Sequence, residues 1–153
     1  MDDQFGSPLS TKFLHASLST RQIGRPIIYY KSVSSTNAVG FHAAELGTSH
    51  GTVILADHQT AGKGRLGRAW HSPERKNLYF SIVLTQAPSK ALISWIPLLT
   101  GVALAETLES ESTAPIVLKW PNDILCCEKK LGGILCEGRP KEKGNSVCVV
   151  GIG

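Results

Sequence analysis

Short apolar segments, most of them rich in β-branched or aromatic residues, are the feature of this chain that most restricts its fold. They cover residues 27–30, 52–57, 77–84, 116–118, 124–127, 132–136 and 147–152, and polar turns separate several of them. Residues 37–46, which Gly47 ends, and residues 91–108 have helical character, and Pro97 fits the second helix in its first turn or at a kink. Together these segments predict an α+β fold with a mixed, mostly antiparallel sheet and helices packed on one face.

The chain of 153 residues is long enough to bury a core, and it corresponds to one domain or most of one. Residues 1–26 lack clear periodicity, so we expect an N-terminal extension with a short helix at most, followed by a domain over residues 27–153. Because the sequence stops within the apolar segment 149–153, we expect this domain to be incomplete at its C-terminal end. Neither a secretory leader nor an apolar run of membrane-spanning length is apparent, which favours a cytoplasmic protein.

The cysteines do not follow a metal-binding or disulfide pattern. Cys126 and Cys127 are adjacent, Cys136 and Cys148 are isolated, and the sequence contains no C-x-x-C pair. The histidines show no ligand spacing near them. We therefore expect reduced thiols within the sheet rather than a zinc site or a disulfide framework.

A loop in which glycines alternate with cationic residues follows the apolar segment 52–57. It reads Gly62-Lys63-Gly64-Arg65-Leu66-Gly67-Arg68. Glycine permits a close backbone approach to a ligand, and Lys and Arg supply charge and hydrogen-bond donors, so the loop predicts a mobile clamp for a phosphate or carboxylate. The alternative is a surface hairpin with solvated charges. The glycine spacing formally matches a dinucleotide-binding fingerprint, but neither an amphipathic helix nor an acidic residue at the required distance follows it.

Three further polar clusters are candidates for chemistry, and each also has an ordinary structural explanation. They are Ser35-Thr36-Asn37, Lys119-Trp120-Pro121-Asn122-Asp123 and Lys130-Leu131-Gly132-Gly133-Ile134-Leu135. The first is a helix cap, or a site for a neutral polar ligand or an anion. The second is a local turn, or a place where Asn and Asp contact a ribose or metal-bound water. The third is a solvated Lys in a hairpin, or a Lys beside glycines that admit a ligand.

Taken in this order, the four clusters resemble the motifs of the biotin protein ligases. The match around the glycine loop extends from His58 and Gln59 to Ala69 and Trp70, and the ending Gly151-Ile152-Gly153 is similar to the start of a further glycine motif in that family. The resemblance runs from residue 27 to the end of the chain. It implies a biotin ligase catalytic domain, whose fold is like that of the class II aminoacyl-tRNA synthetases.

The resemblance implies a two-step reaction. Biotin and ATP, with Mg²⁺, give biotinyl-5′-adenylate and pyrophosphate, and a Lys of a biotin carboxyl carrier protein then attacks the adenylate. The implied catalytic residues are Lys130 and Arg65, and the implied metal ligand is Asp123. The implied biotin and adenylate site comprises Ser35, Thr36, Asn37, Gln59, Gly62, Lys63, Gly64, Arg65, Arg68, Trp70, Lys130, Gly132 and Gly133, and the nucleotide and magnesium region comprises Lys119, Asn122 and Asp123.

The sequence also sets expectations for partners and alternatives. Lys63 stands where the best-known members of the family carry Arg, so it keeps the charge but not the bidentate fork. Because residues 1–26 are too few for a helix-turn-helix domain, we expect no DNA binding. Because no apolar run is long enough for a membrane span, we expect no membrane contact. A homodimer is compatible with the sequence. A lipoate or octanoate ligase or transferase of the same fold is the nearest alternative. A nucleic-acid-binding module built on the basic loop is the alternative of another class, although a net charge of +4 is small for it.

Overall fold

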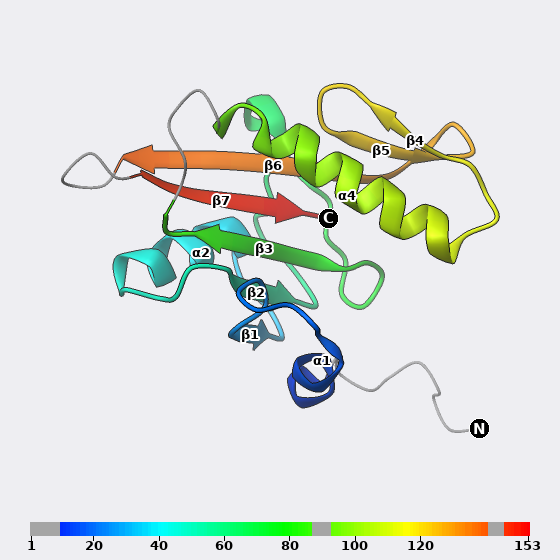
Figure 1. The fold of residues 1–153 in the computed structure, drawn as a ribbon. Coiled ribbons are helices and arrows are strands. Elements are labelled where there is room, and N and C mark those ends of the chain that lie inside the picture. The colour runs from blue at the N-terminus through cyan, green and yellow to red at the C-terminus, as the bar shows by residue number, and fades with distance from the viewer. Residues whose placement is uncertain (1–9, 87–92, 141–145) are drawn as a thin grey trace.

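The structure is a computed structural model, and it describes residues 10–86, 93–140 and 146–153 (Figure 1). Within these ranges seven strands form one sheet in the order β1-β2-β3-β7-β6-β5-β4. They are β1 (Ile27–Tyr30), β2 (Thr52–Ala56), β3 (Tyr79–Leu84), β4 (Ile116–Lys119), β5 (Asp123–Cys126), β6 (Lys129–Pro140) and β7 (Ser146–Ile152). β1 and β2 are parallel, and the other neighbouring pairs are antiparallel. The predicted α+β class with a mixed, mostly antiparallel sheet is therefore confirmed.

Strand β6 is longer than its apolar residues 132–136 predict. Its first part, from Lys129 to Gly133, pairs with β5, and its later part, from Ile134 to Pro140, pairs with β7. The two ends of β6 are exposed and polar, so hydrogen bonding to two neighbours extends the strand beyond its buried part. Of the polar turn predicted over 139–145, Arg139 and Pro140 belong to β6, and residues 141–145 lie outside the described residues.

The helical segments in the described ranges are α1 (Thr11–Ser17), α2 (Thr36–Glu45), the 3-10 turn η1 (Arg65–Gly67) and α4 (Ile96–Glu111). α2 and α4 correspond to the two predicted helices, and residues 91 and 92 of the second prediction lie outside the described residues. Gly47 follows α2 with a φ of +84°, a conformation that glycine adopts without steric strain. Pro97 lies in the first turn of α4, where a backbone N–H has no partner within the helix.

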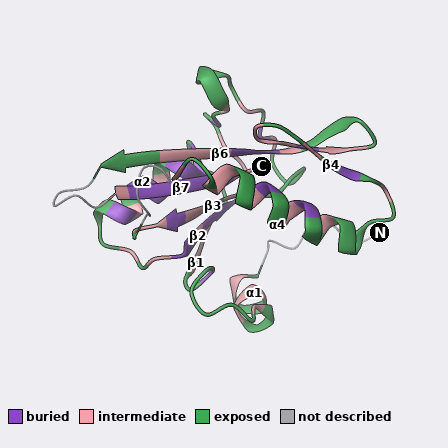
Figure 2. Ribbon diagram, turned by 45° about the horizontal axis from the view of Figure 1, so that its top comes forward, coloured by how far each residue is buried: buried purple, intermediate pink, exposed green. Residues whose placement is uncertain are grey.

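The two longer helices cover opposite faces of the sheet, which corrects the expectation that the helices pack on one face (Figure 1). α2 packs Phe41 against Val149 of β7, whereas α4 packs Leu104 in a cluster with Val150 of the same strand. Since successive side chains of a strand point to opposite faces, these two contacts place the helices on different sides. β7 is therefore buried on both faces, and Figure 2 shows it mostly in the colour of buried residues.

The candidate site therefore lies beside the central strands β6 and β7, rather than beside an edge strand of the sheet. The core divides into a cluster under α2, a cluster under α4 at β4 and β5, and a third that joins α4 to β6 and β7. The four cysteines are free thiols, and three of them lie in strands as predicted, whereas Cys127 lies exposed in the turn between β5 and β6. Among the described residues, the structure contains no helix that is both long and apolar enough to cross a membrane.

Candidate functional site

A cavity of about 450 Å³ lies beside the centre of the sheet, and each of the four polar clusters contributes to its lining. Four segments that are distant in sequence therefore meet: the start of α2, the segment between β2 and β3, the turn between β4 and β5, and the adjoining parts of β6 and β7. The predicted site residues that line it are Ser35, Thr36, Asn37, Gln59, Lys63, Gly64, Arg65, Arg68, Trp70, Lys119, Asn122, Asp123, Lys130 and Gly133. This convergence is the main geometric result for the sequence-predicted site.

The first turn of α2 supplies a neutral, polar part of the lining. Ser35 precedes α2 at the N-cap position but, within the described residues, its side chain makes no capping hydrogen bond. Gln59 takes over that role, because its Oε1 accepts hydrogen bonds from the backbone N–H of Thr36 at 2.9 Å and from Thr36 Oγ1 at 3.2 Å. The plain helix cap considered for this cluster is therefore not what its side chains form.

Asn37 is held by residues of three strands. Its Nδ2 donates to Leu135 O at 3.2 Å and to Glu137 Oε2 at 2.7 Å, both on β6. Its Oδ1 accepts from Ser81 Oγ of β3 at 2.6 Å, and a Cβ on Gly151 of β7 would overlap that same oxygen. Asn37 is 4% exposed. These contacts fix the amide orientation, so Asn37 determines the shape of this corner of the cavity.

Ser81 and Glu137 are two residues of this network that sequence reasoning missed. Ser81 is fully buried, and besides Asn37 it lies 2.7 Å from Thr36 Oγ1. The available signal was a single Ser at an inward position of the apolar segment 77–84. For Glu137 the signal was an acidic residue directly after the apolar run of β6. Ser81 occupies a buried strand position, where a polar residue needs a partner. Glu137 is half-buried and supplies its carboxylate to Asn37.

The glycine loop forms a small hairpin with η1 at its tip. Gly64 N donates to Arg68 O at 2.7 Å, and Trp70 N donates to Gly62 O at 2.9 Å. Gly67 has a φ of +73°, and the neighbouring Leu66 also has a positive φ of +57°. The hairpin is antiparallel at its base, and no helix follows it among the described residues up to β3, which agrees with the rejection of a dinucleotide-binding fingerprint.

The indole of Trp70 forms one wall of the cavity, and glycines make room for it. A Cβ on Gly133 would lie 3.0 Å from Trp70 Cη2, and a Cβ on Gly153 would lie 2.7 Å from Trp70 Nε1. On the open side, Lys130 Nζ lies 4.9 Å from the centre of the ring. The ring is thus packed against Gly133 of β6 and against Gly153, which follows β7, and it also lies near a cationic side chain, a contact that Lys and Trp make favourably.

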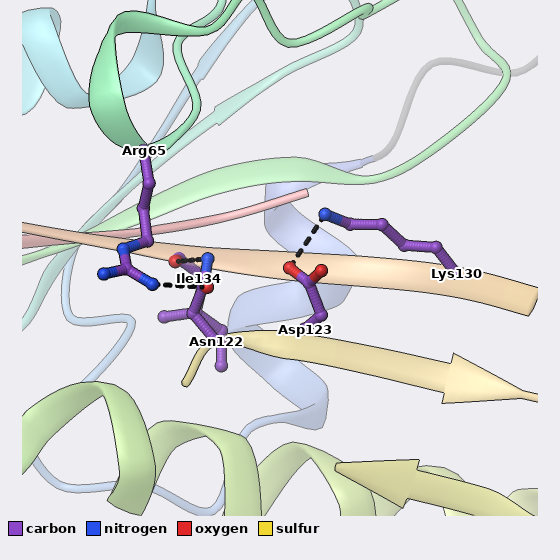
Figure 3. A network of polar contacts seen from close by, with 5 residues as sticks. All are labelled: Arg65, Asn122, Asp123, Lys130 and Ile134. Carbon is purple, nitrogen blue, oxygen red and sulfur yellow. Dashed lines mark hydrogen bonds and ion pairs between the residues drawn. The ribbon is translucent and has the colours of Figure 1, made fainter. Parts of the chain in front are cut away.

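Figure 3 shows how the loop is joined to the second and third clusters. Arg65 Nη1 donates to Asn122 Oδ1 at 3.1 Å, and Asn122 Nδ2 donates to Ile134 O at 2.9 Å. Lys130 Nζ donates to Asp123 Oδ1 in an ion pair of 2.8 Å. Asn122 therefore orients Arg65, and Asp123 holds the Lys130 ammonium at the rim of the cavity.

The charge of the lining is strongly positive. Among the described residues that line the cavity, the cationic side chains are Lys63, Arg65, Arg68, Lys119 and Lys130, and the one acidic side chain is Asp123. Such an excess of cations, in a concave site, favours ligands with several negative charges. Within the described part of the chain, no group of three or more His, Cys, Asp or Glu residues is arranged to hold a metal ion.

Two predicted site residues do not line the cavity. Gly62 lies behind its wall, where a Cβ would be 2.7 Å from Trp70 O and 2.9 Å from Ser72 Oγ. Gly132 faces the backbone of Gly153, whose O would lie 3.1 Å from an added Cβ. Both glycines permit close backbone packing, and their assignment to the ligand site stays a prediction. The lining residues outside the predicted set are Leu66, Ala69, Pro121, Ile134, Leu135, Gly151, Ile152 and Gly153.

Comparison with known proteins gives a consistent result. Residues 29–153 match the model of the biotin/lipoate A/B protein ligase family. The chain is 34% identical over 145 residues to the bifunctional ligase/repressor BirA of Bacillus subtilis, an alignment that covers 95% of this chain and 45% of that protein. It is also 34% identical over 142 residues to the biotin–[acetyl-CoA-carboxylase] ligase of Mycobacterium tuberculosis, with 88% and 53% covered. The chain thus spans about half the length of these curated relatives.

Solved structures resemble the fold as well. The biotin protein ligase of Aquifex aeolicus in complex with biotin and ATP superposes with a TM-score of 0.65 at 38% identity, covering 82% of this chain and 51% of that one. The biotin acetyl coenzyme A carboxylase synthetase of Helicobacter pylori with bound biotinylated ATP gives a TM-score of 0.64 at 27% identity, covering 82% and 59%.

Proposed function

Because this chain belongs to the biotin/lipoate A/B protein ligase family, we propose that its cavity binds biotin and ATP and joins them as biotinyl-5′-adenylate. In the first step, a biotin carboxylate oxygen attacks the α-phosphorus of ATP, a new P–O bond forms and pyrophosphate leaves. In the second step, the amine of a Lys on a biotin carrier protein attacks the adenylate carbonyl and AMP leaves. The observation that carries the proposal is the meeting of the four clusters around one cation-rich cavity.

The neutral and cationic parts of the lining suit different parts of these substrates. The start of α2 and Gln59 present hydroxyl and amide groups, which match the neutral ureido ring of biotin. The cationic side chains lie on the loop, at the end of β4 and on β6, where they match a carboxylate and a triphosphate. Two anions repel each other as they approach, and fixed cations reduce that repulsion most in the transition state.

We assign Lys130 and Arg65 to that task in different ways. Lys130 is held on a strand by its ion pair with Asp123, so it provides a fixed charge where the carboxylate meets the α-phosphate. Arg65 extends from the glycine hairpin and reaches Asn122 on the opposite side of the cavity, so it links the loop to the rest of the site. A closed loop shields an adenylate from water, which would otherwise hydrolyse it.

Magnesium accompanies ATP in the proposed reaction, and the described lining of the cavity offers it one carboxylate. Mg²⁺ normally binds one or two carboxylates together with substrate phosphates and water. The single carboxylate in the lining, among the described residues, is that of Asp123, and Lys130 already occupies one of its oxygens. Asp123 as a metal ligand therefore stays a prediction, and we derive no step through the metal. Placement in the cytoplasm and a homodimer stay predictions too.

Binding and chemistry can be tested separately in the full-length protein. We expect calorimetry to detect biotin binding, tighter biotin binding in the presence of a non-hydrolysable ATP analogue, and little binding of lipoic or octanoic acid. Tight lipoic acid binding without biotin binding would instead favour the lipoate alternative. A salt-dependent gel shift with no biotin binding would favour the nucleic-acid module.

Lys129 offers a matched control for Lys130, because it is the preceding residue of β6 and is absent from the lining. Lys130→Ala should lower the rate of pyrophosphate release by roughly 10²–10³-fold, the scale of removing one fixed donor. Lys129→Ala should leave that rate close to wild type. Arg65→Ala should release the adenylate into solution faster. Equal pyrophosphate release by wild type and Lys130→Ala would show that the assigned role of Lys130 is wrong.

A further inference from the structure

Two thiols face each other between the central strands β6 and β7. Cys136 Sγ and Cys148 Sγ are 3.0 Å apart. Cys136 pairs with Val150, and Cys148 pairs with Gly138, so the two cysteines are diagonal neighbours on adjacent antiparallel strands. Both belong to the cluster on the α4 side of the sheet. The sheet ladder therefore holds two sulfur atoms in contact.

The two thiols differ in access. Cys148 is fully buried, whereas Cys136 is half-buried and lines a second cavity of about 470 Å³ on the α4 side. Trp95 and Leu98 at the start of α4 also line that cavity, and it shares Asn122 and Ile134 with the lining of the candidate site. A small oxidant can therefore reach Cys136, and through it Cys148.

The contact also makes the two sulfur atoms chemically unequal. The hydrogen bond with Cys148 lowers the pKa of the Cys136 thiol, although burial acts in the opposite direction. The same hydrogen bond, together with burial, raises the pKa of Cys148. The accessible thiol is thus the one with the greater thiolate character, and thiolate is the reactive form.

We propose that Cys136 and Cys148 are a reversible oxidation site for hydrogen peroxide. The Cys136 thiolate attacks one peroxide oxygen, the O–O bond breaks and hydroxide leaves, which gives a sulfenic acid on Cys136. Cys148 sulfur then attacks the Cys136 sulfur, the S–O bond breaks and the oxygen leaves as water. In total, two thiols and one peroxide give one disulfide and two waters.

The contact between the sulfur atoms means that the bond can form through a small movement. Formation requires the sulfur atoms to approach from 3.0 Å to about 2.05 Å while the strands stay paired. A thiol reductant that reaches Cys136 can exchange with this bond and restore both thiols. Leu135 and Glu137, which flank Cys136, hold Asn37 on the other face of the sheet, so the thiol pair lies directly behind the candidate site.

Peptide mapping can identify the bond. Cleavage after Lys141 and Lys143 separates Cys136 from Cys148, and Cys126 and Cys127 fall on a third peptide between Lys119 and Lys129. After exposure of the native protein to a few equivalents of peroxide, we expect a linked pair of peptides carrying Cys136 and Cys148. Dithiothreitol should restore both thiols. The proposal would be overturned if Cys136 and Cys148 were both still reduced after peroxide had oxidised Cys126 or Cys127.

Variants test the order of the two steps. Cys148→Ala should stop the reaction at a sulfenic acid on Cys136, which dimedone traps, and Cys136→Ser should form neither product. Cys127→Ser is the control, since Cys127 is exposed and outside the pair, and it should form the Cys136–Cys148 bond as wild type does. Dimedone labelling of Cys148 in Cys136→Ser, at the rate seen for Cys136 in Cys148→Ala, would refute the assigned roles. Circular dichroism shows whether each variant is folded. If a variant does not fold, the peptide map of the wild-type protein still tests the proposal.

Discussion

Replacing Gly151 with Ala should destabilise the protein by disrupting the contacts of Asn37. An added Cβ would overlap Asn37 Oδ1 and would lie 3.0 Å from its Cγ and 3.1 Å from its Nδ2. Asn37 has no free direction in which to move, because hydrogen bonds hold both ends of its amide and the residue is 4% exposed. The variant must therefore break some of these bonds or shift β7.

The expected magnitude follows from those contacts. Each hydrogen bond of a buried amide contributes about 1 kcal/mol, and crowding a packed site costs about 1–3 kcal/mol. We therefore expect Gly151→Ala to lower the free energy of unfolding by about 2–4 kcal/mol, measured by urea denaturation. Gly138→Ala is a matched control on the adjoining strand, since its Cβ would meet nothing nearer than Val147 O at 4.0 Å. It should change stability by less than about 0.5 kcal/mol.

A double-mutant cycle tests the cause. In the background of Asn37→Ala, the added methyl group no longer meets an amide, so Gly151→Ala should cost less than about 1 kcal/mol. An unchanged cost in that background would show that the clash lies elsewhere. A Gly151→Ala variant as stable as Gly138→Ala would refute the reasoning altogether.

Three further changes have distinct expected results. Tyr29 Oη donates to Asp57 Oδ2 at 2.6 Å, and this bond, followed by burial, raises the pKa of Tyr29 to about 12. Because the folded state favours the neutral phenol, the stabilisation relative to Tyr29→Phe should be complete below about pH 10 and should disappear as the pH rises through about 12. Urea titrations at several pH values would measure this loss. Trp70→Ala removes one wall of the cavity and should weaken biotin binding at least about tenfold in calorimetry, a loss of about 1.4 kcal/mol, whereas Trp120→Ala, at a side chain 82% exposed, should not. Gly67→Ala should lower stability by about 1 kcal/mol in urea denaturation, since φ is +73° there, although a Cβ would meet no atom within 4 Å.

The local pattern predicted most strands, but it did not predict the face that each helix covers. Residues 27–30 and 147–152 match β1 and β7 closely, because β-branched runs report local preference directly. The placement of the helices depends on alternation between buried and exposed side chains. β7 has buried residues on both faces, so its sequence carries no such alternation. The length of β6 was missed for a related reason, since hydrogen bonds to two neighbours, rather than apolar residues, define its ends.

The candidate site shows the same division between local and long-range information. The four clusters carried enough chemistry to be singled out, and the cavity brings them together. Ser81 and Glu137 were missed because each is one polar residue whose partner, Asn37, lies more than forty positions away in the chain. Gly62 and Gly132 were assigned to the ligand because a sequence cannot show whether a glycine accommodates a substrate or another backbone.

The position of β7 has a consequence for how the sheet assembles. β1, β2 and β3 form one ribbon, β4, β5 and β6 form another, and β7 pairs with the inner strand of each although it follows both in the chain. The two ribbons contain mainly local pairings, whereas β7 must bridge β3 and β6 after both exist. The cavity spans the same junction, because the glycine hairpin belongs to the first ribbon and Lys130 to the second. A ligand that contacts both ribbons stabilises their junction. The amide hydrogens of β7 should therefore exchange with solvent more slowly in the complex than in the free protein.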